Sequence, residues 1–229
     1  FIPKKKTIKI NTDFTFLTFI KPTLNNKKKQ NIISSDYLNK QKIEFFINKN
    51  YCLELKIDNK KILNLKRKFL EKNWYLIGFS YSPKKNIIKI FQYPVNHENS
   101  IKEILKKEKV KILIIFNKHI SIASSIIDKK NNHLHNYNSF NGKIDSPKIF
   151  EGIIKENQIL KLSTKPSFKI KLKLIAHWDF TKFISTEKIV DRGKYKLNGY
   201  TVNFPARAMK GILWNGEEFN WKNKPEHYS

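Results

Sequence analysis

Short apolar runs separated by polar turns recur along the first hundred residues, and few of them show the 3.6-residue period of a helix. Phe14–Ile20 alternates aromatic or β-branched residues with others and ends at Lys21-Pro22, which predicts a strand. Asn48-Lys49-Asn50 lies between two such runs, as in a β-hairpin. The runs predicted as strands are Phe14–Ile20, Ile43–Ile47, Tyr51–Ile57, Ile62–Leu65, Trp74–Tyr81 and Ile87–Tyr93. Their regular spacing predicts an all-β sandwich.

The middle of the chain has a weaker pattern. Ile101–Lys109 is a short, charged helical candidate, whereas Ile112–Phe116 is more typical of a strand. Residues 128–142 are polar and are predicted to form a surface loop. Asn141-Gly142 then gives a tight turn into a further strand that ends at Phe150. Phe168–Ala176 alternates apolar residues with Lys and is the clearest amphipathic strand of the chain.

Length and composition limit the class of protein. The chain has 229 residues, of which 40% are hydrophobic, so it can bury a substantial core in one or two domains. We expect a β-sandwich over residues 1–160, and a closing strand with a Trp-rich connector over 161–229. The single cysteine, Cys52, excludes an intrachain disulfide and favours a reducing compartment, so a cytoplasmic location is expected. No apolar run is long enough for a membrane span, no signal peptide is visible, and the first residue, Phe1, indicates a cut or processed N-terminus.

The formal charge of +27 raises the question of a nucleic-acid partner. Only three of the 46 basic residues are Arg, the residue that makes bidentate contacts with bases. Lys, Ile, Asn and Phe are all encoded by A/T-rich codons, so an AT-rich genome explains the composition. The basic excess is also spread along the chain. Nucleic acid is therefore not the expected partner.

Rare residues gather after His177, where three of the four tryptophans, two of the three arginines and the single methionine lie. No catalytic or nucleotide-binding motif accompanies them. The acidic residues Asp179, Asp191, Glu217 and Glu218 do not form a catalytic pair, and neither His177 nor His227 has a convincing partner. The pair His133 and His135 is expected to be solvated rather than metal-bound. We expect structural roles for all of these and assign no catalytic, cofactor-binding or metal-binding residue.

The sandwich region resembles laminin-G and concanavalin A-like domains, which have a jelly-roll fold. The resemblance lies in FTFLTFIKPT (Phe14–Thr23), WYLIGFSYSPKKNIIKIFQ (Trp74–Gln92) and FNGKIDSPKIFEG (Phe140–Gly152). It implies an all-β jelly-roll sandwich followed by an extended C-terminal connector. Because this fold serves many functions, the resemblance predicts an architecture only.

The connector resembles the large (beta) subunit family of N,N-dimethylformamidase, through WDFTKFIST (Trp178–Thr186), the block Val190–Glu218 and WKNKPEHY (Trp221–Tyr228). Thr181, Asn198 and Ile212-Leu213 depart from the family pattern. The residues that carry the family signature are Trp178, Asp179, Phe180, Asp191, Gly199, Asn203, Pro205, Arg207, Met209, Gly211, Trp214, Trp221, Pro225, His227 and Tyr228. The resemblance implies an amide hydrolase whose mononuclear iron is held by tyrosine and carboxylate ligands in a catalytic domain C-terminal to this region.

Three functions follow from these observations. The first is the non-catalytic N-terminal part of a dimethylformamidase-like amide hydrolase. Its partners would be the catalytic domain of the same polypeptide and a small subunit, in an oligomer, and alone it would be inactive and prone to aggregation. The second is a stand-alone sandwich that binds carbohydrate or protein. The third is a basic nucleic-acid-binding or ribosomal protein of an AT-rich genome, for which one continuous basic stripe on the surface would be the sign.

Overall fold

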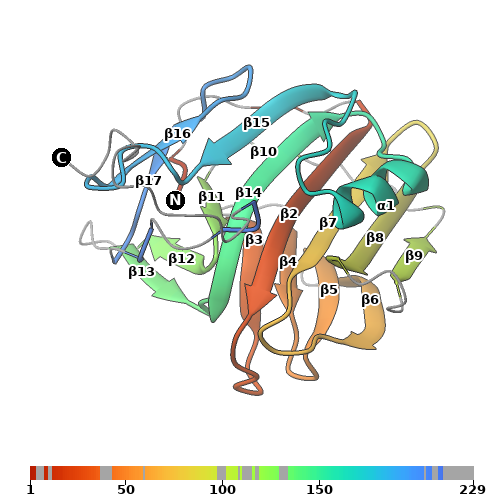
Figure 1. Cartoon of the computed structure of the whole chain (residues 1–229), viewed down its shortest axis with the longest axis horizontal. Coiled ribbons are helices and arrows are strands. Elements are labelled where there is room, and N and C mark those ends of the chain that lie inside the picture. The colour runs from red at the N-terminus through yellow and green to blue at the C-terminus, as the bar shows by residue number, and fades with distance from the viewer. Residues whose placement is uncertain are drawn as a thin grey trace.

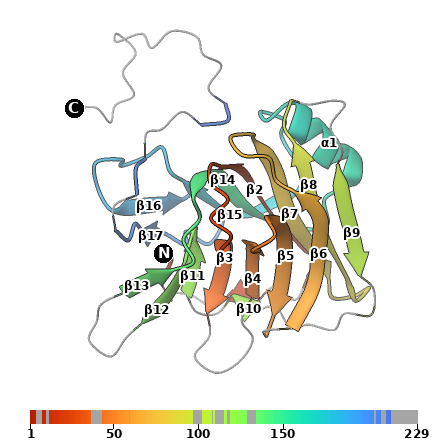
Figure 2. The same ribbon diagram turned by 90° about the horizontal axis from the view of Figure 1, so that it is seen from below.

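The chain folds into a sandwich of two antiparallel β-sheets, with one short helix on the outer face of the larger sheet (Figure 1). This confirms the predicted all-β sandwich. Figure 2 shows the two layers from a second direction. The computed structural model describes residues 1–3, 8–9, 12–36, 43–58, 60–96, 102–107, 109, 115–116, 119–128, 134–203, 205–207 and 211–213.

The larger sheet has eight strands. In spatial order they are β17 (Gly199–Tyr200), β16 (Lys188–Asp191), β15 (Lys173–Asp179), β14 (Gly142–Glu151), β2 (Phe14–Pro22), β7 (Tyr75–Ser82), β8 (Ile87–Pro94) and β9 (Glu103–Lys107). Strands from the N-terminal and C-terminal parts of the chain therefore pair at the centre of this sheet, where β14 lies between β2 and β15.

The smaller sheet has five strands, and two short pairs of strands lie outside both sheets. The five are β11 (His119–Ile122), β3 (Gln30–Asp36), β4 (Ile43–Ile47), β5 (Cys52–Ile57) and β6 (Lys60–Lys68). The short pairs are β1 (Ile8–Lys9) with β10 (Ile115–Phe116), and β12 (Ser125–Asp128) with β13 (Leu134–Tyr137).

The hairpin between β4 and β5 shows why the local predictions succeed. The Asn48 side-chain oxygen accepts hydrogen bonds from the backbone N–H groups of Asn50 (2.9 Å) and Cys52 (3.2 Å). An asparagine that bonds its own backbone two residues further on is a common turn device. The predicted hairpin is therefore confirmed, and Cys52 is a buried residue of the second strand, as expected.

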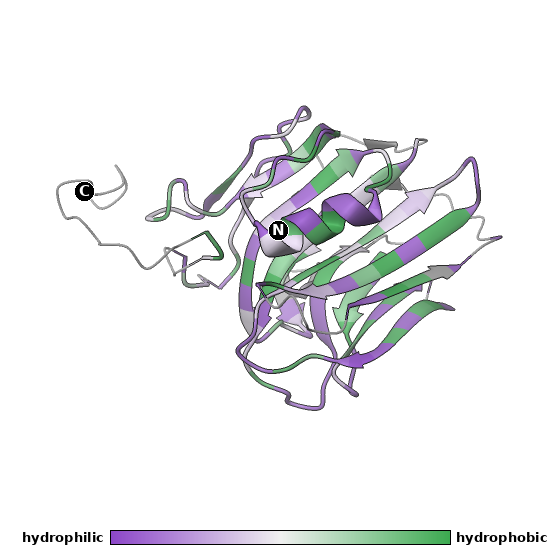
Figure 3. Cartoon of the chain, turned by 45° about the vertical axis from the view of Figure 1, so that its right-hand side comes forward, coloured by the Kyte–Doolittle hydropathy of each residue, from purple (hydrophilic) through white to green (hydrophobic). Residues whose placement is uncertain are grey.

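The main core lies between the two sheets and is rich in aromatic residues. Phe45 of the smaller sheet contacts Phe79 and Phe16 of the larger sheet edge-on, with ring centroids 5.2 and 6.2 Å apart. Burying each such side chain contributes about 1.5–3 kcal/mol. Figure 3 shows hydrophobic and hydrophilic residues alternating along several strands. Successive side chains of a strand point to opposite faces of its sheet.

A second apolar cluster covers the outer face of the larger sheet. It includes Leu76, Phe91 and Tyr93 of the sheet, together with Ile159 and Leu162 of helix α1 (Glu156–Thr164). Figure 1 shows α1 lying over β7 and β8. The helix was not predicted from the sequence, and its two buried residues at i and i+3 stabilise it through tertiary packing.

One predicted element is wrong. The helical candidate Ile101–Lys109 contains strand β9, because successive residues pack on opposite faces: Ile104 packs against the outer cluster and Leu105 against the main core. The Glu103 carboxylate also accepts the backbone N–H groups of Lys66 (3.0 Å) and Arg67 (2.8 Å), which ties edge strand β9 to edge strand β6.

Other elements differ from prediction in extent. Residues 128–142 include strand β13, which pairs with β12, so they are not loop throughout. Strand β15 begins at Lys173, although the burial alternation predicted from Phe168 onward is present. The expected division at residue 160 falls within α1, and β15–β17 continue the larger sheet; the division into domains stays a prediction. No helix among the described residues is long and apolar enough to cross a membrane.

Candidate functional site

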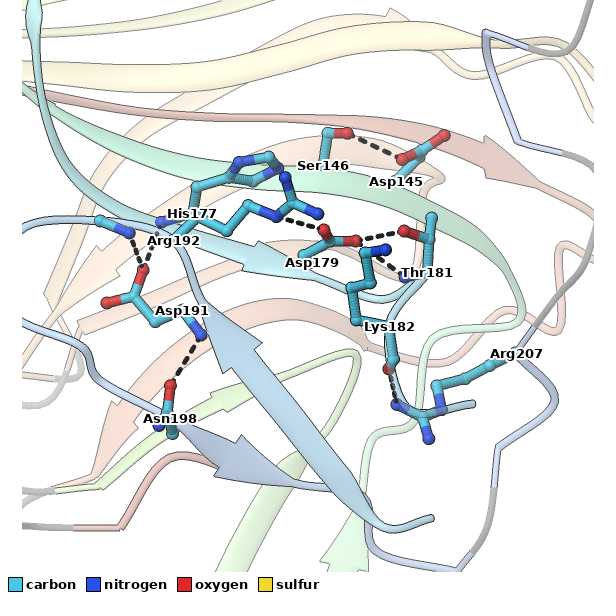
Figure 4. A network of polar contacts seen from close by, with 11 residues as sticks. Asp145, Ser146, His177, Asp179, Thr181, Lys182, Asp191, Arg192, Asn198 and Arg207 are labelled. Carbon is cyan, nitrogen blue, oxygen red and sulfur yellow. Dashed lines mark hydrogen bonds and ion pairs between the residues drawn. The ribbon is translucent and has the colours of Figure 1, made fainter. Parts of the chain in front are cut away.

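Strands β14, β15 and β16 bring several of the predicted signature residues together at one side of the larger sheet (Figure 4). Trp178 on β15 is fully buried in the main core, and its indole N–H donates to the Leu197 carbonyl oxygen at 2.9 Å. Asp179, the next residue, points to the opposite face. Phe180 is partly buried against the main core. The alternation along β15 thus separates an apolar anchor from a polar cluster on the outer face.

Asp191 at the end of β16 organises the following turn. Its carboxylate is fully buried and accepts three backbone N–H groups, those of His177, Gly193 and Leu197, each at 2.7 Å. Its own N–H donates to the Asn198 side chain at 2.9 Å. Every one of these bonds is to a part of the backbone or to a local side chain, so Asp191 acts as a buried structural anchor.

Gly193 is a residue that the sequence analysis missed. A Cβ atom at this position would overlap the Ile175 carbonyl oxygen and the Ala176 backbone, so only glycine allows the turn to lie this close to β15. The sequence signal was a glycine two residues after Asp191. Gly199 is restricted in the same way, because a Cβ atom there would overlap the Phe1 carbonyl oxygen.

Asp179 forms the second polar centre. Its carboxylate pairs with the Arg192 guanidinium at 2.5 Å and accepts the Thr181 hydroxyl at 2.6 Å and the Thr181 N–H at 2.9 Å. Burial acts to raise the pKa of Asp179, but the Thr181 hydrogen bonds and the Arg192 charge outweigh it and hold this pKa below its usual value. Both oxygens of the Asp179 carboxylate therefore contact local donors.

His177 lies on the outer face beside this pair and opposite Lys148 of β14. Burial, together with the positive charge of Lys148, lowers the pKa of His177 to about 4. Burial also lowers the pKa of Lys148. The imidazole is neutral near pH 7, and within the described part of the chain it makes no hydrogen bond to a hydroxyl or a carboxylate. The nearby Ser146 hydroxyl donates to Asp145 (2.9 Å), so no base–nucleophile pair is formed here.

Arg207 fixes the loop between β15 and β16. Its guanidinium donates to four backbone carbonyl oxygens, those of Lys182 (3.4 Å), Lys188 (2.9 Å), Phe183 and Thr186. A planar group with five N–H donors can hold several carbonyls that point inward from one loop. The side chain thus closes residues 182–188 rather than facing a ligand.

The last described segment is fastened to β14. The Ile212 N–H donates to the Asp145 carboxylate at 2.8 Å, and a Cβ atom at Gly211 would lie 2.5 Å from the same oxygen. Asn203 donates to the Asn136 side chain at 2.9 Å, whereas Pro205 is exposed. The signature residues outside the described part are Met209, Trp214, Trp221, Pro225, His227 and Tyr228, and Glu217, Glu218 and His133 also lie outside it.

The contacts of these polar side chains are typical of structural residues rather than of catalytic or metal-binding residues. Asp179, Asp191 and the terminal guanidinium nitrogens of Arg207 each bond to groups of the chain itself. In the portion of the chain that the structure covers, no group of three or more His, Cys, Asp or Glu residues could hold a metal ion. The described residues therefore offer no fit for the iron that the resemblance implies.

No family model matches the chain. The chain is 33% identical over 95 residues to the N,N-dimethylformamidase beta subunit of Paracoccus aminophilus, and 33% identical over 94 residues to that of an Alcaligenes species. Each match covers 39% of this chain and 12% of the relative, so the chain matches only about an eighth of the length of these beta subunits.

Solved structures show the fold alone. A candidate carbohydrate-binding protein from Bacteroides ovatus aligns with a TM-score of 0.54 over 84% of this chain and 52% of its own, at 14% identity. A heptameric pentraxin from Limulus polyphemus aligns with a TM-score of 0.49 over 71% of this chain and 75% of its own, at 15% identity. The chain is thus a jelly-roll β-sandwich that is similar in sequence, over two fifths of its length, to dimethylformamidase beta subunits.

Proposed function

We propose that this chain is the non-catalytic β-sandwich part of a longer, dimethylformamidase-like amide hydrolase, in which it packs against another domain or subunit. The observation that carries the proposal is the 33% identity to two dimethylformamidase beta subunits over about 95 residues. Those relatives are much longer than this chain, so the part of them that matches is a small one.

The engagement of the polar side chains supports a non-catalytic role. A catalytic carboxylate must reach a substrate, a proton or a metal ion. Asp191 is fully buried among backbone N–H groups, and Asp179 is held by Arg192 and Thr181. These contacts tie β15 to β16 and to the turn that follows β16. A connector of defined shape suits a segment that must orient one domain against the next.

We expect no iron site among the residues that the structure describes. The iron that the resemblance implies would be held in the catalytic part of such an enzyme, where a bound metal ion would supply Lewis-acid chemistry. The described residues provide no set of ligands for it. No step of amide hydrolysis is therefore assigned to this chain.

The direct test is an activity assay of the purified chain with N,N-dimethylformamide, followed by release of dimethylamine. We expect no release above the buffer blank. Hydrolysis by this chain alone would refute the non-catalytic assignment.

A second test addresses membership of a longer enzyme. The coding DNA and its transcript are sequenced past the Ser229 codon. A reading frame that continues into the remainder of a dimethylformamidase-like subunit is the expected result, and a stop codon there contradicts it. A glycan array, with no bound glycan expected, tests the alternative of a carbohydrate-binding module.

A further inference from the structure

The segment that joins α1 to β15 has a regular arrangement of lysines that the proposed function does not use. From residue 168 to residue 174 exposed and partly buried positions alternate strictly. Phe168, Ile170 and Leu172 pack against the apolar cluster on the outer face of the larger sheet. Lys169 and Lys171 lie between them and are exposed. The segment thus has an apolar base and a cationic crest.

The crest extends to both sides of this segment. Lys161 and Lys165, near the end of α1, and Lys173, at the start of β15, are also exposed. We call these five residues, Lys161, Lys165, Lys169, Lys171 and Lys173, the lysine ridge. Figure 1 shows α1 and the chain that follows it on the outer side of the larger sheet, away from the smaller sheet.

Charge is concentrated here beyond the average of the chain. The whole sequence has 46 basic and 19 acidic residues, whereas residues 157–178 contain the five lysines and no acidic residue. The acidic neighbour Glu151 pairs with Lys173 at 2.8 Å. Lys161, Lys165, Lys169 and Lys171 form no ion pair among the described residues. The ridge therefore keeps an uncompensated positive charge.

The spacing of the ridge fits an extended partner. Alternate residues of an extended chain lie about 6.6–6.8 Å apart on one face. An extended partner segment with carboxylates at alternate positions would present one carboxylate to each of Lys169 and Lys171, which form no ion pair among the described residues. The ammonium group of lysine acts as a point charge that suits a single carboxylate.

The composition of the ridge disfavours nucleic acid as the partner. It contains no Arg for bidentate contacts with bases. Phe168, the aromatic residue of the segment, is turned to the apolar base and covered by Lys161, whose Nζ lies 6.0 Å from the ring centroid, so it offers no platform for stacking bases. An acidic protein segment is the better match.

We propose that the lysine ridge is an interaction surface for an extended acidic polypeptide segment. The partner would be an acidic strand or loop of the adjoining domain or subunit, and this assignment rests on the proposed function. Ile212, in the last described segment, packs against the same apolar cluster as Phe168 and Ile170.

Fluorescence anisotropy tests the proposal. One probe is a labelled peptide of alternating Glu and Thr, and the other is labelled oligo-dT, which represents nucleic acid and is measured separately. The ridge variant is Lys165→Glu/Lys169→Glu/Lys171→Glu. The matched control reverses the same number of exposed lysines on β6 of the other sheet, as Lys60→Glu/Lys61→Glu/Lys66→Glu. We expect the acidic peptide to bind, binding to weaken as NaCl is raised, and the ridge variant to bind about tenfold or more weakly, with a loss below about twofold in the control.

Three results would overturn the inference. Absence of peptide binding, or an equal loss in both variants, shows that the ridge has no special affinity. Tighter binding of oligo-dT than of the peptide replaces the acidic segment by nucleic acid. Thermal unfolding verifies that both variants are folded. If charge reversal unfolds the chain, Lys→Gln changes at the same three ridge positions replace it in the binding assay. None of these results bears on the activity assay or on the coding sequence beyond Ser229.

Discussion

The buried carboxylate of Asp191 allows a sharp prediction about stability. Asp191→Asn keeps the size of the side chain but replaces one acceptor oxygen by an NH2 group. The oxygen that remains can accept His177 and Gly193, as Oδ1 does now. The NH2 group then faces the Leu197 N–H, which at present donates to Oδ2 at 2.7 Å. Two donors would point at each other in a fully buried site.

The expected loss follows from these contacts. A hydrogen bond to a charged group contributes about 1.5–3 kcal/mol, and a buried donor without an acceptor costs about 1–3 kcal/mol. One such bond is lost, two donors are left facing each other without an acceptor, and the other two bonds lose their charge. We therefore expect the free energy of unfolding to fall by about 3–4 kcal/mol. In urea this lowers the midpoint by about 1 M or more for a chain of this size.

Urea unfolding followed by the fluorescence of the buried Trp178 region measures the change. Glu187→Gln is the matched control, because Glu187 is an exposed carboxylate in the same region and should change stability by less than about 0.5 kcal/mol. Asp191→Ala removes all three acceptor contacts and should cost more than Asp191→Asn. A midpoint for Asp191→Asn equal to that of the wild type would refute the role of Asp191 as an anchor.

Three further predictions follow from the same region. His177 has a folded pKa of about 4 against about 6.5 unfolded, so the unfolded chain binds more protons between these values and stability falls as the pH drops from 6.5 to 4. His177→Gln should flatten this dependence in urea midpoints across that range, and an unchanged slope would assign it to other groups. Arg207→Lys cannot satisfy four carbonyls, so hydrogen exchange should accelerate within residues 182–188 while β2 stays protected; equal protection in both proteins would contradict the clamp. Gly193→Ala should lower the unfolding temperature, whereas Ser167→Ala, at an exposed position, should have little effect. An unchanged unfolding temperature for Gly193→Ala would show that the turn can move away from Ile175.

Local patterns were sufficient where the structure depends on neighbouring residues. The Asn48 turn and the alternation of Phe14–Ile20 are such cases. The structure confirms strand β2 and the hairpin of β4 and β5. They failed where packing decides the conformation. Helix α1 is short and forms on the outer apolar cluster, and β9 is a strand because Ile104 and Leu105 face two different clusters.

The candidate site shows the same division. The sequence by itself identified Trp178, Asp179, Asp191 and Arg207 as unusual and gave the resemblance that the comparisons support at the level of sequence similarity. It could not assign their roles, because the atoms that engage them belong to other strands and turns. Asp191 binds backbone groups 14 residues before it and two and six residues after it. Only the pairing of β15 with β16, and the turn that follows β16, bring these groups within hydrogen-bonding distance of one carboxylate. For this reason the tertiary structure alone decided that Asp191 anchors the fold.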